Sequence, residues 1–294
     1  MTRYAIIEAP SVLGLKPTGV DRLPAELLQH GLAEQLNARR AGRVVPAAAY
    51  DPQRDPQTLL RNAHGIAAYS KVLADTVADV IGRGEFPILL GGDCSILLGS
   101  ALALRRRGRY GLLFIDGHAD FYQPEALTTG EAASMDLAFA TGRGPEVVTN
   151  LEGLRPLVRD EDVVAFGFRD AQEQREYGSQ PLPRELLALD LSEVRRLGVA
   201  RAAQRAVEHL TSAERPTQGF FIHLDADVVN DALMPAVDYR MADGLSWDEL
   251  RAVLRTALAS GRAVGIEITI YNPALDADGV SGRELARTLI ESLK

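Results

Sequence analysis

Residues 110–120 read YGLLFIDGHAD, an apolar run that ends in two aspartates and a histidine. A short apolar run bounded by polar residues is typical of a buried strand and is too short for a core helix. Similar runs recur along the chain, and several are apolar on both faces, as parallel strands covered by helices are. The segments that we expect to form strands are residues 4–7, 43–46, 86–90, 110–115, 162–168, 220–224 and 263–268.

Helical patterns separate these runs. An apolar period of 3.6 residues predicts a long helix over residues 56–81, and a last helix is expected over residues 281–293. Ser246 fits a helix N-cap because Glu249 follows three residues later, as in a capping box. This alternation favours an α/β fold with a doubly wound, mostly parallel sheet, and we expect a single domain over residues 1–294.

Composition and charge exclude several classes of protein. The chain has 294 residues, of which 46% are hydrophobic and 24% charged, as in ordinary globular domains. A net charge of −8 argues against a nucleic-acid partner. The single cysteine, Cys94, excludes an intrachain disulfide, and no apolar run approaches the roughly 20 residues of a membrane helix. We therefore expect a cytoplasmic protein that acts on a small molecule without a membrane partner.

Acidic side chains follow three of the expected strands, with Asp93 after residues 86–90, Asp116 after 110–115 and Asp225 after 220–224. Because alternate residues of a strand share a side, Asp116, His118 and Asp120 can converge, and so can Asp225 and Asp227. Carboxyl ends of parallel strands meet at one edge of a sheet, so the two groups should be neighbours. Carboxylates packed together are costly unless a cation neutralises them. Any one of these aspartates alone could cap a helix or turn, but the group as a whole predicts a metal site.

The donor atoms indicate which metal would bind. Asp116 and Asp225 could each bridge a pair of ions, which favours a dinuclear site. Oxygen-rich ligation with one imidazole favours manganese. Such ions would ionise a water molecule to a hydroxide nucleophile.

The motifs resemble those of the arginase/agmatinase (ureohydrolase) family, which includes formiminoglutamase-type enzymes. That family has GGDHS, DAHxD, DxDxxDP, a GGLT-like turn and ExNP in this order. The counterparts here are residues 91–95, 116–120, 225–231, 243–246 and 270–273, which span nearly the whole chain. The resemblance implies a three-layer αβα fold around an eight-stranded parallel sheet, two Mn²⁺ per chain, a homotrimer or homohexamer, and hydrolysis of guanidino or amidine C–N bonds.

The resemblance also implies two sets of metal ligands. The first ion would be held by Cys94, Asp116, Asp120 and Asp225, and the second by Asp116, His118, Asp225 and Asp227. Asp227 would also orient the nucleophile. Cys94 replaces a histidine of the family. A thiolate ligand would shift the preference of the first site towards zinc or iron, whereas a buried cysteine could also be a neighbour that does not coordinate.

Two further departures concern the substrate and the proton donor. Ile270 stands where the family has the glutamate that pairs with the substrate guanidinium, and the segment 121–154 lacks the family's histidine. Glu131 or Asp136 could replace that histidine as general acid, or both could be solvated loop carboxylates. The other candidates for contact with the substrate are Asp238, Tyr239, Tyr271 and Asp276.

His223 precedes Asp225 by two residues and should point to the same side of the strand. We expect His223 to donate a hydrogen bond to a carboxylate that binds the metal, and it could also transfer a proton. The alternative is a core histidine whose hydrogen bonds are made within the fold and which has no role in the site.

Three functions follow from these residues. The first is a metal-dependent hydrolase of a non-peptide C–N bond in a guanidino, amidino or formimino compound. The second is a single-metal deacetylase that uses Asp116, His118 and Asp225, although the pair of adjacent histidines usual in such enzymes is absent. The third is a noncatalytic member of the family.

Overall fold

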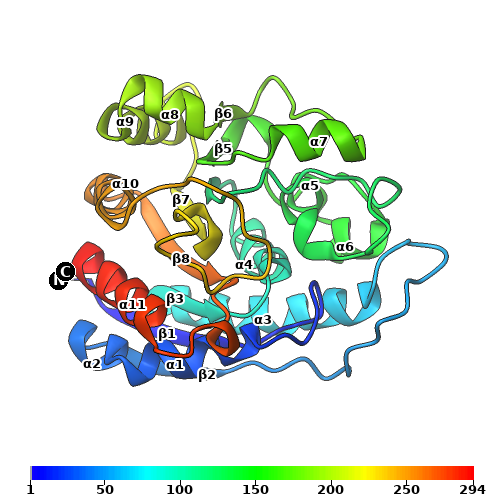
Figure 1. Ribbon diagram of the computed structural model, residues 1–294, viewed down its shortest axis with the longest axis horizontal. Coiled ribbons are helices and arrows are strands. Elements are labelled where there is room, and N and C mark those ends of the chain that lie inside the picture. Colours follow the sequence, from blue (N-terminus) through cyan, green and yellow to red (C-terminus); the bar gives the residue numbers. More distant parts are fainter. Residues whose placement is uncertain (1) are drawn as a thin grey trace.

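The computed structural model describes residues 2–294 (Figure 1). Its centre is an eight-stranded sheet in the order β2-β1-β3-β8-β7-β4-β5-β6, and every adjacent pair is parallel. The predicted α/β fold is confirmed. The strands are β1 (Tyr4–Ala9), β2 (Arg39–Arg43), β3 (Phe86–Gly91), β4 (Gly111–Ile115), β5 (Val163–Phe166), β6 (Leu187–Leu189), β7 (Phe220–Asp225) and β8 (Ala263–Thr269).

Helices cover both faces of the sheet, so the molecule has three layers (Figure 1). One face packs against α1 (Leu23–Gln29), α2 (Leu32–Leu36), α8 (Leu191–Leu197), α9 (Val199–Leu210), α10 (Trp247–Ala259) and α11 (Val280–Leu293). The other packs against α3 (Ala63–Gly82), α4 (Leu97–Arg105), α5 (Asp136–Ala140) and α6 (Glu146–Thr149), while α7 (Ala171–Tyr177) buries no side chain.

Alternation along the central strands divides the core into these two halves. In β7, Ile222 and Leu224 face α9 and α10, whereas Phe221 faces the α3–α4 side. His223 and Asp225 share the side of Phe221 by the same alternation. The α3–α4 side of the sheet therefore receives the polar residues of β7.

The first edge of the sheet differs from the prediction. The strand expected at residues 43–46 is wrong, because β2 comprises Arg39–Arg43. Arg40 and Arg43 both form ion pairs with Glu8 of β1, and Val45 is exposed. An edge strand of charged residues lacks the apolar run by which a buried strand is recognised in a sequence. The expected strand was therefore placed on the apolar valines that follow β2. At the opposite edge, β6 has three residues and was not expected.

The helix predictions are correct in place and differ at the ends. The long helix α3 begins at Ala63, not near residue 56, because Oδ1 of Asp55 accepts hydrogen bonds from the amides of Gln57 and Thr58 in a turn. The capping box of α10 is confirmed, with Ser246 and Glu249 each accepting a hydrogen bond from the other's amide. The segment 121–154, expected as a loop, contains α5 and α6, which are too short to show a period.

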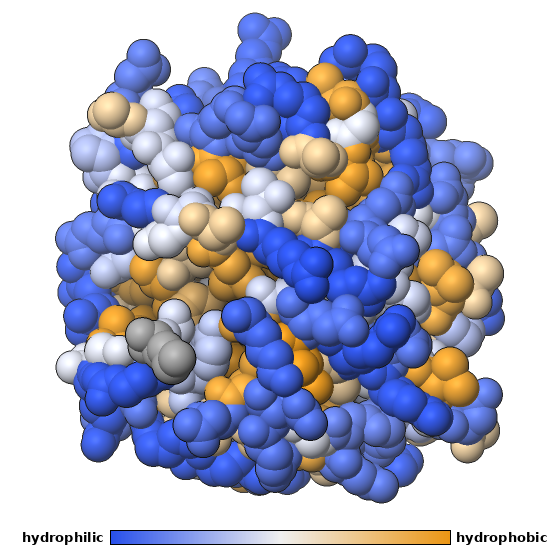
Figure 2. Space-filling model, turned by 90° about the vertical axis from the view of Figure 1, so that its left-hand side faces the viewer, coloured by the Kyte–Doolittle hydropathy of each residue, from blue (hydrophilic) through white to orange (hydrophobic). Residues whose placement is uncertain are grey.

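Figure 2 looks onto the side of the molecule that carries α10 and α11, where apolar residues form separate patches between hydrophilic ones. Arginines of α10 join these two helices: Arg251 donates to Thr288 Oγ1 at 3.2 Å, and Arg255 donates to the carbonyl of Glu291.

Among the helices of residues 2–294, none has both the length and the apolar character to cross a membrane.

Candidate metal centre

The acidic residues meet at the carboxyl edge of the sheet, as predicted from their positions after β3, β4 and β7. Asp116 follows β4, Asp225 ends β7, and Asp227 lies in the 3-10 turn Ala226–Val228. Cys94 begins the 3-10 turn Cys94–Ile96 that follows β3. Strands β3, β8, β7 and β4 are consecutive in the sheet, so the residues after them lie side by side.

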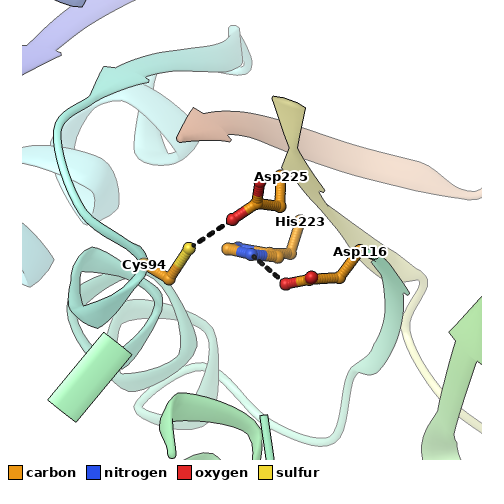
Figure 3. Close-up of side chains that lie close together, drawn as sticks. All are labelled: Cys94, Asp116, His223 and Asp225. Atoms are coloured by element: carbon orange, nitrogen blue, oxygen red, sulfur yellow. Dashed lines mark hydrogen bonds and ion pairs between the residues drawn. The ribbon is translucent and has the colours of Figure 1, made fainter. Parts of the chain in front are cut away.

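Four side chains form the innermost group: Cys94, Asp116, His223 and Asp225. One ligand atom of each lies within 4.8 Å of those of the others. Cys94 Sγ donates to Asp225 Oδ2 at 2.9 Å, and His223 Nε2 lies 3.9 Å from Asp116 Oδ2 (Figure 3). All four are at least 98% buried. The group therefore offers sulfur, nitrogen and oxygen donors around one point.

A second group lies beside the first and shares Asp116. It consists of Asp116, His118 and Asp227, whose ligand atoms also lie within 4.8 Å of one another. His118 Nδ1 is 2.8 Å from Asp227 Oδ2 and 3.8 Å from Asp116 Oδ1. The amide of Gly117 donates to Asp227 Oδ1 at 3.0 Å. A Cβ at Gly117 would lie 2.8 Å from the carbonyl oxygen of Asp227, so the close approach of the two turns requires glycine.

Asp120 belongs to a third group, with Cys94 and Asp136. Asp120 has a φ of 44°, and the left-handed backbone turns the chain after β4. Asp136 accepts a hydrogen bond from the amide of Leu137 at 2.8 Å through Oδ1. Cys94 thus lies between two candidate ligand sets, one containing His223 and the other containing Asp120 and Asp136.

Burial determines the protonation of this cluster. Loss of solvent raises the pKa of Asp116, Asp120 and Asp225 well above the ordinary value, and neighbouring carboxylates raise each of them further. The pKa of Asp136 is raised for the same two reasons, burial first and then the charge of Glu267. These carboxyl groups resist ionisation together unless a cation accompanies them.

Asp227 and His118 form the exception. Burial opposes ionisation of Asp227, but the adjacent imidazolium of His118 outweighs it and lowers the pKa of Asp227. Burial likewise opposes the charge on His118, yet Asp227 raises the pKa of this imidazole to about 9. The two side chains form an ion pair that a bound cation would replace.

Unsatisfied atoms show that the residues fit a divalent cation. Asp116 Oδ2, Asp136 Oδ2 and His223 Nε2 are buried and have no hydrogen-bond partner among residues 2–294. Buried polar atoms are normally paired, and an orphan of this kind indicates a missing ion or water. Carboxylate, imidazole and thiolate are all ligands of divalent metals.

A cavity of about 430 Å³ opens above the cluster. The floor of the cavity is formed by Cys94, His118, Asp120, Asp225 and Asp227. Its walls come from the segment 121–134, from Glu173 and Tyr177 of α7, and from the loop residues Leu15, Tyr239 and Ile270. A volume of this size accommodates a small organic molecule.

Two of the predicted proton donors take different positions. Glu131 lines the cavity, is 3% exposed, and lies 3.2 Å from Nη1 of Arg61 through Oε1. Asp136 is buried beside Cys94 and does not line the cavity. Of the two, Glu131 is the one that a ligand in the cavity could reach.

The predicted substrate contacts are dispersed. Tyr239 lines the cavity. Tyr271 is fully buried against Gly282 of α11 and donates to Asp276 Oδ2 at 2.7 Å, so both residues face away from the cavity. Asp238 accepts a hydrogen bond from Asn272 Nδ2 at 2.9 Å and does not line it either.

Sequence reasoning missed the partner of His223. Glu267 is the register neighbour of His223 in the adjacent strand β8, and its Oε1 lies 2.7 Å from His223 Nδ1. Glu267 is completely buried and also accepts a hydrogen bond from Ser100 Oγ at 2.5 Å. A single charged residue within the apolar run of β8 was the available signal, because such a residue needs a buried partner.

The fold and this cluster define a three-layer α/β protein with metal-capable side chains at the carboxyl edge of its sheet. The chain belongs to the arginase family, whose model matches residues 3–294. It is 28% identical over 284 residues to an arginase of Bacillus caldovelox, with 94% of this chain and 93% of that protein aligned.

Solved structures of arginases have the same fold as this chain. A solved structure of the Bacillus caldovelox arginase superimposes with a TM-score of 0.87 at 27% identity, covering 100% of this chain and 98% of that one. An arginase structure from Bacillus subtilis gives a TM-score of 0.84 at 26% identity, with the same coverage. The resemblance in the sequence motifs is thus confirmed at the level of family and fold.

Proposed function

We propose that this protein is a metal-dependent hydrolase that cleaves a non-peptide C–N bond in a small guanidino, amidino or formimino compound. The observation that carries the proposal is the buried cluster of carboxylates, imidazoles and thiol on the floor of a cavity of about 430 Å³. Bound divalent ions would ionise water near neutral pH and polarise the trigonal carbon of the substrate. The family membership supports the same reaction class.

Two ions per chain fit the number of ligands. The second ion would be held by Asp116, His118, Asp225 and Asp227, an oxygen-rich set that suits Mn²⁺. The first ion would lie beside Cys94, whose sulfur is a softer ligand and suits zinc or iron. Asp116 and Asp225 are the candidates to bridge the two ions.

The residues around the cavity would complete the reaction. Asp227 is fixed by the amide of Gly117 and could orient the nucleophile. Glu131 faces the cavity as a carboxylate and could accept a proton from the attacking water and pass it to the leaving amine. His223 lies beneath the cavity floor and is absent from the lining, so a direct transfer of a proton to the substrate is not part of this proposal.

The substrate is expected to lack the full charge of a guanidinium ion. Ile270 presents an apolar side chain to the cavity where a glutamate would pair with that cation, and the carboxylate of Glu131 is already paired with Arg61. A modified or uncharged guanidino, N-hydroxyguanidino, amidino or formimino compound suits such a wall.

Metal analysis combined with a substrate screen tests the proposal. The purified protein is dialysed against Mn²⁺ and Zn²⁺, its metal content per chain is measured, and a panel of these compounds is screened for release of ammonia or urea. Two ions per chain with turnover that disappears in Asp116→Asn would support a dinuclear hydrolase. One tightly held zinc would favour the deacetylase-like alternative, and no bound ion would leave a noncatalytic scaffold.

A further inference from the structure

His223 occupies an unusual place beneath the metal cluster. Its side chain is completely buried in the middle of the sheet, and within the described part of the chain Nε2 has no hydrogen-bond partner. Figure 3 shows this ring between Cys94, Asp116 and Asp225, with its dashed line to Asp116. All three neighbours carry an oxygen or sulfur that can bind a metal. An imidazole nitrogen without a partner at such a point needs an explanation.

The ring is held in one orientation from its other nitrogen. His223 Nδ1 lies 2.7 Å from Glu267 Oε1, and Ser100 Oγ donates to Glu267 Oε2 at 2.5 Å. The ring also stacks on Phe114, with centroids 4.6 Å apart and planes 7° apart. Since a carboxylate only accepts hydrogen bonds, Nδ1 carries the proton and the lone pair of Nε2 points into the cluster. This is the arrangement by which proteins orient a histidine that binds a metal.

We propose that His223 Nε2 is itself a metal ligand, and that with Cys94, Asp116 and Asp225 it forms a four-coordinate site that selects Zn²⁺ over Mn²⁺. The proposal rests on the metal binding proposed above and names the metal of its first site. His223 belongs to strand β7 and would approach this ion from below the cavity. It would supply a nitrogen ligand in place of the one that is lost where Cys94, in the turn after β3, replaces the family's histidine.

The distances are compatible with such an ion. Zinc bonds of about 2.0–2.3 Å place tetrahedral donors about 3.3–3.8 Å apart. The separation of His223 Nε2 and Asp116 Oδ2 is 3.9 Å, close to this range. Cys94 Sγ and Asp225 Oδ2 are 2.9 Å apart because the thiol donates a hydrogen bond. On binding, the thiol proton leaves to solvent, this hydrogen bond is lost, and both atoms turn towards the ion.

Another position near Cys94 is the competing outcome. Asp120 and Asp136 could hold the ion together with Cys94 on the opposite side of the sulfur. We favour the His223 position because, within residues 2–294, Nε2 of this ring lacks a partner while its other nitrogen is held by a hydrogen bond to Glu267, which is held in turn by Ser100.

Anomalous diffraction from crystals of the full chain loaded with Zn²⁺ tests the position directly. We expect a zinc ion about 2.0–2.1 Å from His223 Nε2. An ion held by Asp120 or Asp136, with His223 Nε2 more than about 3 Å away, would overturn the proposal. Such a result would leave the proposed hydrolase intact, whereas a crystal without any bound ion would contradict both.

Variants test the same point in solution. His223→Gln removes the ligand, and His64→Gln makes the same change on an exposed histidine of α3 as a matched control. With a competing chelator, we expect His223→Gln to weaken one zinc site by more than 100-fold and to leave Mn²⁺ binding at the site of His118 unchanged. Zinc affinity equal to that of the control variant would overturn the proposal.

Glu267→Gln provides a test that does not remove the ligand. Glu267 positions His223 and does not touch the ion, so its loss should lower zinc affinity by about 10- to 100-fold. The visible absorption of the Co²⁺-substituted protein should shift in this variant, because the imidazole is no longer held by a carboxylate. If His223→Gln does not fold, an unchanged Co²⁺ spectrum and zinc affinity in Glu267→Gln would still contradict the proposal.

Discussion

The phenol of Tyr239 donates a hydrogen bond to Glu131 Oε2 at 2.5 Å, although 108 residues separate the two in the chain. Arg61 holds the other oxygen of the same carboxylate. Glu131 is thereby fixed in the wall of the cavity by two partners from different loops. Burial and this hydrogen bond raise the pKa of Tyr239, so the phenol remains a donor at neutral pH.

The position of Glu131 predicts a role in turnover. If Glu131 accepts a proton from the attacking water and passes it to the leaving amine, Glu131→Gln should lower kcat by about 10²- to 10⁴-fold, the usual contribution of a general acid–base residue. Tyr239→Phe keeps the carboxylate and should lower kcat by less than about 10-fold. Steady-state assays on the substrate from the screen measure both, with metal content as the control for an intact cluster. Wild-type kcat in Glu131→Gln would rule out this role.

Ile270 predicts the charge that the cavity accepts. This residue has a φ of 70°, which is strained for a β-branched side chain, and it lines the cavity. Ile270→Glu should bind arginine about 10- to 100-fold more tightly than Ile270→Gln, because only the carboxylate forms charge-assisted hydrogen bonds with the guanidinium. Calorimetric titration of the metal-loaded variants compares the two. Equal affinities would show that arginine does not reach this wall.

The central strands of the sheet could be predicted from the sequence, whereas its two edge strands could not. The apolar runs of β3, β4, β7 and β8 were recognised because buried parallel strands contain little besides apolar residues. The edge strands were not, since β2 is rich in arginine and β6 is three residues long. The charged strand β2 shows no hydrophobic pattern because an edge strand needs little burial, and the three apolar residues of β6 are too few to show one.

The site was predictable where one strand supplies several residues. Asp116, His118, Asp225 and Asp227 follow from alternation and from the shared edge of parallel strands. The pairing of His223 with Glu267 depends on the register between β7 and β8, which no local pattern contains. The division of Asp116 and Asp120 between separate groups likewise depends on the left-handed backbone at Asp120.

The capping box of α10 predicts a measurable loss of stability. Ser246→Ala removes the side chain that accepts a hydrogen bond from the amide of Glu249 at 3.2 Å, and should lower the free energy of unfolding by about 1 kcal/mol. Ser192→Ala, an exposed position in the first turn of α8, serves as the matched control and should change it by less than about 0.5 kcal/mol. Urea denaturation distinguishes the two, and equal effects would show that the box adds nothing.

Protons and metal ions should compete for the cluster. In the metal-free protein, burial raises the pKa of Asp116, Asp120 and Asp225, so these groups favour the folded state only while protonated and lose that contribution as pH rises. Bound ions need the ionised forms. The increase in Tm caused by saturating Mn²⁺ should therefore grow between about pH 5 and pH 8.

Differential scanning calorimetry with and without Mn²⁺ measures this increase. Asp116→Asn removes a carboxylate common to both proposed sites, and its Tm should respond weakly to the ion at every pH. An increase in Tm that is constant with pH in the wild type would mean that the ion displaces no protons.

Cys94 predicts a difference between metals. Its sulfur lies within 4.8 Å of the ligand atoms of Asp116, His223 and Asp225, while the three-residue group around His118 contains no sulfur. Cys94→Ser keeps the size of the side chain and replaces a soft ligand by a weak hard one, so zinc affinity should fall by at least about 10-fold and Mn²⁺ affinity should change little. Thr269→Val, which removes the hydroxyl 3.1 Å from Sγ, controls for loss of the hydrogen bonds around the sulfur. Competition titrations with both metals provide the comparison. Equal losses for zinc and manganese in Cys94→Ser would mean that the cysteine supports the fold of the site and does not bind the ion.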